Sequence, residues 1–162
     1  MKLALYIGDH TKDDPTVRLG WWLTRLVQKG QFSTVTHVEA ILQENADGTV
    51  NIASSSLREG GVRIKENTRL TPGHWIIVET GYSTETAFHW FKDHLGQQYD
   101  ALGAFATCMP FQWSQKNRWF CNQAVGAAIG LKSPETFGPS QFAAFALTIG
   151  NDVTAKFFGS RP

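Results

Sequence analysis

A cysteine at the start of an expected helix is the candidate nucleophile of this sequence. Cys121 follows Trp119 and Phe120 where polar residues give way to helical periodicity, and these two aromatic side chains can shield the thiol from water. Unpaired backbone N–H groups and the positive end of the helix dipole favour a thiolate over a thiol, and the thiolate is the reactive form. The alternative is a buried cysteine in an apolar helix. Cys108 follows an apolar run without this context, so we interpret it as structural.

A histidine in an expected strand is the candidate base. His37 lies in mid-strand, where a sheet can hold an imidazole reproducibly against a nucleophile. Glu39 is two residues further on, so it shares a strand face with His37 and can fix its tautomer. Asn51, Ser54 and Ser55, on the strand expected to return beside it, are the other candidates for this third position. The alternative for His37 is a half-exposed strand histidine without a catalytic role.

The other histidines and the glycine pattern indicate no metal or cofactor site. His89 and His94 lie five residues apart on one expected helix, so they do not share a face as an H-x-x-x-H metal pair does. The sequence has no zinc-ligand spacing, no glycine-rich phosphate loop and no G-x-S-x-G motif. We therefore expect chemistry that needs neither a metal ion nor an organic cofactor.

The first half of the chain is rich in strand patterns that would hold His37. Strands are expected at residues 2–7, 36–43, 49–54, 62–65 and 74–79. Asp47-Gly48 supplies a tight turn between the second and third of these, so the middle region is typical of an antiparallel sheet of consecutive hairpins. One helix is expected in this half, over residues 16–29, bounded by Pro15 and Gly30.

The second half is expected to be helical and to present Cys121. Helices are predicted to begin at residue 83 or 84, at Asp100, near Phe120 and at Pro139, with Gly96 and Gly130 as terminators. A final edge strand is expected over residues 153–158. The predicted fold class is α+β, a strand-rich half followed by a helix-rich half, in one domain over residues 1–162.

Composition argues against several classes of function. The 15 Lys and Arg residues balance 14 Asp and Glu residues, so nucleic-acid binding is not expected. No stretch approaches the ~20 apolar residues that span a bilayer, so no membrane span is expected. The N-terminal residues do not form a signal peptide, which predicts a cytoplasmic protein whose two cysteines stay reduced.

Three motifs occur in a fixed order along the chain. They are Thr36-His37-Val38-Glu39, Gly96-Gln97-Gln98-Tyr99-Asp100 and Trp119-Phe120-Cys121-Asn122-Gln123-Ala124-Val125. In this order they resemble the circularly permuted NlpC-type branch of the papain-like cysteine hydrolases, in which the His strand precedes the Cys helix. YiiX-like and YaeF-like proteins belong to that branch, and its layout is similar to that of lecithin:retinol acyltransferases. The segment 53–62 resembles small phage and bacterial members.

The resemblance implies a permuted papain-like fold, an antiparallel sheet packed against helices. It implies Cys121 as nucleophile and His37 as base. It also implies a third residue from the strand after the His strand, which favours Asn51 or a serine of residues 54–56, while strand geometry keeps Glu39 as a candidate.

The same resemblance suggests where substrate would bind. Tyr99 is a candidate oxyanion donor or substrate contact, and Ser54 and Trp119 are further candidate contacts. The chain departs from the family where Asn122-Gln123 follows the cysteine, since Ser-Glu is common there.

We expect a cysteine hydrolase that cleaves an amide or ester bond through a covalent acyl-enzyme on Cys121. The resemblance implies a peptide, a peptidoglycan peptide or an acyl substrate without choosing among them. A non-catalytic binding or structural module on the same fold is the alternative, because Asn122-Gln123 and the open third position depart from the family pattern. The sequence does not specify the oligomeric state.

Overall fold

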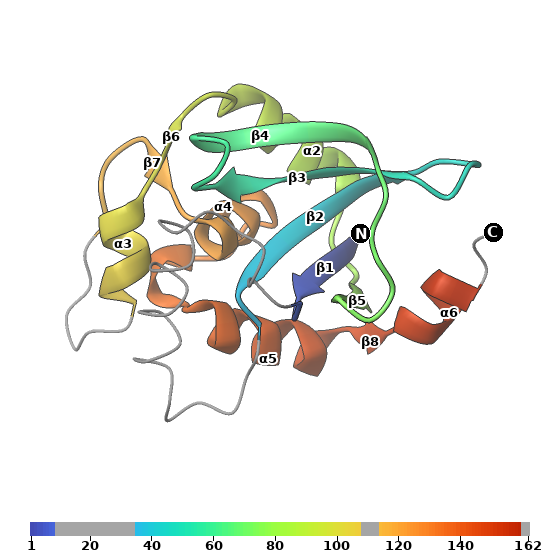
Figure 1. Cartoon of the computed structure of the whole chain (residues 1–162). Coiled ribbons are helices and arrows are strands. Elements are labelled where there is room, and N and C mark those ends of the chain that lie inside the picture. The colour runs from blue at the N-terminus through green and yellow to red at the C-terminus, as the bar shows by residue number, and fades with distance from the viewer. Residues whose placement is uncertain (9–34, 108–113, 160–162) are drawn as a thin grey trace.

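The strands meet in one eight-stranded sheet with the order β7-β6-β4-β3-β2-β1-β5-β8 (Figure 1). The computed structural model describes residues 1–8, 35–107 and 114–159. The expected helix over residues 16–29 and Cys108 lie outside the described residues. The strands are β1 Lys2–Tyr6, β2 His37–Glu44, β3 Val50–Ser56, β4 Gly61–Thr68, β5 Trp75–Glu79, β6 Gln98–Tyr99, β7 Arg118–Trp119 and β8 Asn151–Asp152.

The helices follow mostly in the second half of the chain. They are α2 Thr84–Asp93, α3 Ala101–Ala106, α4 Cys121–Ala128, the 3₁₀ turn η2 Pro134–Thr136, α5 Pro139–Ile149 and α6 Thr154–Gly159. The expected α+β class is confirmed. The longest helix of the described ranges is α5 with 11 residues, and none there is both long and apolar enough to cross a membrane.

The expected hairpins are confirmed in the centre of the sheet. β2, β3 and β4 pair antiparallel in sequence order, with Gly48 at φ 81° in the turn between β2 and β3. β1 inserts between β2 and β5 and is antiparallel to both. The sheet is nevertheless mixed, because the two-residue strands β6 and β7 run parallel, with Gln98 beside Arg118. The prediction of a purely antiparallel sheet was therefore wrong at this edge.

The buried apolar side chains of the strands belong to two separate clusters. Val38 and Ala40 of β2 pack with Ala124 and Val125 of α4 in the larger cluster, to which α2 adds Phe91. Burial of a side chain the size of Phe or Val contributes about 1.5–3 kcal/mol, so this cluster fastens α4 to β2 and β3. Figure 1 shows α4 beside these two strands, with α3, β6 and β7 gathered at one side of the molecule.

The second cluster explains why the last expected strand is a helix. Asn151 and Asp152 pair with β5, and Val153 donates its N–H to the carbonyl of Ile77 at 2.9 Å. Asp152 then accepts the Thr154 backbone N–H at 2.9 Å, which starts a helical turn. The Thr154 hydroxyl accepts the N–H of Ile77 at 2.8 Å. The helix α6 that follows buries Phe157 among apolar side chains of the sheet. The prediction of a strand over residues 153–158 was therefore wrong.

The expected helix boundaries are confirmed around the remaining elements. Ser83 caps α2 by accepting the N–H of Thr86 at 3.2 Å. Asp100 caps α3, and Gly96 and Gly130 have positive φ angles after α2 and α4.

The junction of β4 with β6 positions the chain that leads to the candidate site. Val62 donates its N–H to the carbonyl of Gln97 at 2.8 Å, and Tyr99 donates to the carbonyl of Gly60 at 3.1 Å. Gly61 lies so close to β6 that a Cβ atom there would be 1.9 Å from the carbonyl oxygen of Gln97.

We predict that Gly61→Ala destabilises the protein far more than Gly60→Ala. Both glycines have positive φ, but a Cβ atom at Gly60 would meet nothing within 4 Å. Gly60→Ala should cost about 1–2 kcal/mol from backbone strain alone. Gly61→Ala should cost more than about 3 kcal/mol because it pushes β6 away. Urea denaturation measures both, and equal losses of unfolding free energy would contradict the account.

Candidate active site

The structure brings His37 and Cys121 together although they are far apart in the sequence, close enough for Cys121 to raise the pKa of His37. His37 is the first residue of β2 and Cys121 the first residue of α4, so the contact joins the ends of two elements. The thiol residue is nearly buried, at 3% exposure, whereas 23% of the imidazole side chain is exposed. The histidine is therefore the more exposed of the two side chains.

The start of α4 is held by polar contacts on both of its sides. The Gln123 side chain accepts the N–H of Phe120 at 3.4 Å and donates to the hydroxyl of Ser114 at 3.0 Å. Phe120 itself is extended, with φ −98° and ψ 168°, so helical geometry begins at Cys121. Cys121 thus occupies the first helical position, where backbone N–H groups lack helical partners.

Asn122 anchors the same turn from inside the protein. This fully buried side chain donates to the carbonyl of Phe137, and its amide oxygen accepts the Cys121 thiol at 3.6 Å. A buried amide needs such partners, because an unpaired one costs about 1–3 kcal/mol. The Asn122-Gln123 pair is therefore a structural part of this site, a role for which the sequence offered no signal.

Glu39 is the side chain that holds His37. Its Oε1 atom lies 2.7 Å from His37 Nε2, and only 3% of the carboxylate side chain is exposed. Arg63 from β4 grips both oxygens, with Nη1 2.7 Å from Oε2 and Nη2 bonded to Oε1. Burial acts to raise the pKa of Glu39, but the hydrogen bonds from Arg63 and the nearby His37 outweigh it and lower that pKa to about 2.

His37 is held as an imidazolium. Burial lowers its pKa, but the opposite charge of Glu39 and the interaction with Cys121 outweigh burial and raise the pKa to about 10. Since Nε2 bonds to Glu39, Nδ1 is the ring nitrogen that this carboxylate does not engage. His37 thus carries a positive charge between the Glu39 carboxylate and the Cys121 sulfur.

The structure does not bring Asn51 to His37. Its amide donates to Gln43 at 3.4 Å, and its oxygen accepts the backbone N–H of Asn67 at 3.0 Å. These contacts lie toward the hairpin end of β3, whereas the Cys121 contact lies at the opposite end of β2. Asn51 therefore does not hold the imidazole, and Glu39 takes that place.

The serines of β3 bind backbone atoms instead of His37 or a substrate. Ser54 is fully buried and donates to the carbonyl of Val38 at 2.6 Å, which corrects its prediction as a substrate contact. Ser55, likewise buried, donates to the carbonyl of Trp119 at 2.6 Å. Ser55 thereby ties β3 to the chain two residues before Cys121.

Asp100 organises the same stretch of chain from the other side. Its fully buried carboxylate accepts the N–H of Gly103 at 2.7 Å and the N–H of Gln115 at 2.9 Å. Its own N–H donates to the carbonyl of Trp119 at 3.1 Å. One residue thus caps α3 and holds both ends of the segment that leads into α4, Gln115 through its side chain and Trp119 through its backbone.

Tyr99 lies close enough to Cys121 for the charge of Cys121 to shift the pKa of the phenol. Burial raises the pKa of Tyr99 well above 10, and the negative charges of Cys121 and Asp100 raise it further. The phenol is therefore an O–H donor at neutral pH. In the described part of the chain the hydroxyl has no hydrogen-bond partner, so it can donate to a bound group.

Trp119 belongs to a cluster of aromatic rings next to the cysteine. Its ring meets Trp90 edge-on at 4.9 Å and His94 edge-on at 5.4 Å, and Nε1 donates to Gln97 at 2.6 Å. His94 in turn stacks on Trp90 at 4.0 Å. These contacts fix the Trp119 ring two residues before Cys121.

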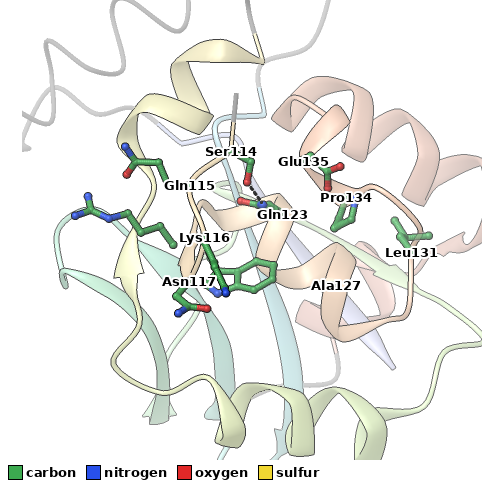
Figure 2. Close-up of a pocket in the computed structure, with 11 residues that line it drawn as sticks. Ser114, Gln115, Lys116, Asn117, Gln123, Ala127, Leu131, Pro134 and Glu135 are labelled. Atoms are coloured by element: carbon green, nitrogen blue, oxygen red, sulfur yellow. Dashed lines mark hydrogen bonds between the residues drawn. The ribbon is translucent and has the colours of Figure 1, made fainter. Parts of the chain in front are cut away.

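An open hollow of about 550 Å³ lies on the other side of α4 (Figure 2). Gln123 and Ala127, four residues apart on one helix face, line it together with Ser114, Trp119 and other residues. Cys121 is not among its described lining residues. We therefore place the candidate active site at the contact of His37 with Cys121 and not in this hollow.

Within residues 1–8, 35–107 and 114–159, no group of three or more His, Cys, Asp or Glu side chains is arranged to hold a metal ion. Arg63 is the residue of the site that sequence reasoning missed. The buried acid beside His37 implies a cation nearby, but only the observed register of three strands shows which one.

Comparisons with known proteins give no relative. No family model matches the chain, and neither a search of curated proteins nor a search of solved structures finds a significant match.

The ion pairs of the site predict a pH-dependent stability. The folded pKa of His37 is about 10 against an ordinary 6.5, so its stabilising contribution is complete below pH 6.5 and is lost as the pH rises through 10. The unfolding free energy should fall by more than about 1 kcal/mol over this window. In His37→Gln this part of the decline should vanish.

Urea denaturation at a series of pH values measures the effect. His89→Gln, which removes an exposed histidine, is the matched control and should keep the wild-type slope. A His37→Gln protein with an unchanged slope between pH 6.5 and 10 would show that His37 is not held as an imidazolium.

Proposed function

We propose that the protein is a cysteine hydrolase that cleaves an amide or ester bond through a covalent acyl-enzyme on Cys121. The observation that supports it most strongly is the assembled row Cys121–His37–Glu39, in which a buried carboxylate holds an imidazolium against a thiol at a helix start. The permuted papain-like fold, with its His strand before its Cys helix, belongs to the same proposal.

Acylation begins from the thiolate–imidazolium pair. The Cys121 sulfur attacks the substrate carbonyl carbon, and the carbonyl π electrons move to its oxygen to form a tetrahedral oxyanion. When the oxyanion collapses, the bond to the amine or alcohol breaks and His37 gives its Nδ1 proton to that leaving group. The products of this step are an acyl-Cys121 thioester, a neutral His37 and a free amine or alcohol.

Water completes the cycle. Neutral His37 accepts a proton from the attacking water as its oxygen bonds to the thioester carbon. The second tetrahedral oxyanion expels the Cys121 thiolate and releases a carboxylic acid, which restores the ion pair. Throughout, Glu39 stays ionised and keeps Nε2 of the ring in place.

Two donors stand ready for the oxyanion. One is the backbone N–H of Cys121 at the start of α4, and the other is the Tyr99 hydroxyl, which stays protonated beside the sulfur. Loss of one such donor in other hydrolases slows the chemical step about 10²–10³-fold. Tyr99 is therefore the second oxyanion donor of the proposal.

The substrate belongs to the class of peptides, peptidoglycan peptides or acyl esters. A thiolate attacks any of these carbonyl carbons by the same route. The Trp119 ring, two residues before Cys121 and held by Trp90 and Gln97, is the candidate apolar contact for such a substrate.

A non-catalytic binding module is the second candidate. The observation that favours it is the burial of Cys121, whose 3% exposure leaves little room for an acyl group. A small activated ester distinguishes the two candidates because it needs little space.

We predict that p-nitrophenyl acetate leaves one acetyl group on Cys121, seen by mass spectrometry of the rapidly quenched protein. Cys121→Ser should lose the adduct, and His37→Gln should slow its formation at least about 100-fold. Cys108→Ser is the matched thiol control and should react like the wild type. Absence of an adduct at Cys121 in a folded wild-type protein would refute the hydrolase and favour the binding module.

A further inference from the structure

Glu39 keeps the imidazole of His37 in place only if a second partner fixes the Glu39 carboxylate. A carboxylate two residues from the histidine on one strand has free side-chain torsions, and alternation alone does not fix them. Its two oxygens are nevertheless both occupied, Oε1 by His37 and Arg63 together and Oε2 by Arg63 alone. The second partner therefore limits where the first contact can form.

Arg63 reaches Glu39 across a whole strand. In the sheet Arg63 of β4 lies opposite Ser54 of β3, and the pairing of Ala40 with Ala53 places Glu39 of β2 on the other side of that serine. Ser54 is small and turns its hydroxyl to the Val38 carbonyl, which leaves the way open for the guanidinium. The fork of Arg63 matches the two carboxylate oxygens, an arrangement that a lysine does not reproduce.

The guanidinium of Arg63 makes a further hydrogen bond from its other edge. Its Nε atom donates to Glu59 in the turn between β3 and β4, and Glu59 pairs with Lys65 as well. The Arg63 side chain is 15% exposed, so the fork is largely withdrawn from water. With a carboxylate on each edge of its guanidinium, Arg63 has little freedom to move away from Glu39.

We propose that Arg63 is a positioning residue, which clamps Glu39 so that the carboxylate fixes the imidazole of His37 against Cys121. This inference rests on the proposed function for its catalytic meaning, while the clamp itself is a property of the three side chains. Arg63 touches no reacting atom. It acts through Glu39 by holding that carboxylate ionised and in one orientation.

The charged groups around the clamp determine the expected pH dependence. Glu39 faces Arg63 from β4 and His37 from its own strand, and His37 faces Cys121 from α4. Further groups act one step away: Glu59 acts on Arg63, and Lys65 acts on Glu59. Cys121 and Asp100 both act on Tyr99. Arg63 and His37 both bond to Glu39. Since His37 is the candidate base, Arg63 is the partner to substitute.

The test replaces the fork but keeps the charge. In Arg63→Lys the Glu39 carboxyl should titrate at least about one pH unit higher than in the wild type, a tenfold change in its protonation constant. Carbon-13 NMR of the Glu39 carboxyl measures this without any substrate. In the pH profile of iodoacetamide labelling at Cys121, the fall in rate at low pH (the acid limb) should likewise move to higher pH. The labelling rate at neutral pH should change less than about threefold.

Two variants separate the clamp from a general structural role. Glu59→Gln removes the charge on the other side of Arg63 but keeps the fork on Glu39, so it should move the titration of Glu39 far less than Arg63→Lys does. In a Glu39→Gln background, Arg63→Lys should no longer move the acid limb of labelling, because its effect passes through the carboxylate. An effect that persists there, or a Glu39 titration unmoved by Arg63→Lys, would overturn the inference.

Failure of the proposed function gives a different result. If Cys121 forms no acyl adduct but Glu39 still titrates higher in Arg63→Lys, the clamp stands and the hydrolase does not. If adducts form and the Glu39 titration stays in place, the hydrolase stands and Arg63 is not its positioning residue.

Discussion

The burial of one carboxylate is the constraint on which the site depends. Moving an ion such as Glu39 from water into a protein costs several kcal/mol unless opposite charges meet it there. Arg63 and His37 meet it from two strands, so its charge is balanced only when β2, β3 and β4 are in register. The same charge keeps His37 protonated. Fold, register and protonation state are thus coupled at one side chain.

The cysteine side of the contact is held by neutral hydrogen bonds. The carbonyl of Trp119 accepts both the Ser55 hydroxyl and the Asp100 N–H, so the chain enters α4 from a fixed point. Asn122 then ties the first turn to the Phe137 carbonyl. The strand-rich half of the chain thus contributes His37 to the contact, and the helix-rich half contributes Cys121.

Local signals in the sequence were enough for much of this arrangement. Strand alternation placed Glu39 beside His37, and cap residues such as Asp100 marked the helix starts. Contacts between distant segments were beyond such signals, because the bridge from Arg63 to Glu39 requires the register of two hairpins. The final segment was misjudged for a local reason: Asp152 starts a helical turn, and Phe157 becomes buried from a helix as readily as from a strand.

The central claim is that His37 activates Cys121 as the nucleophile of the proposed hydrolase. Its most direct test is the pH dependence of iodoacetamide labelling at Cys121, resolved from Cys108 by peptide mapping, in the wild type and in His37→Ala. The account predicts fast labelling at about pH 6, where an ordinary thiol is almost wholly protonated, and its collapse in the variant. Slow labelling at that pH, unchanged by the substitution, would contradict it.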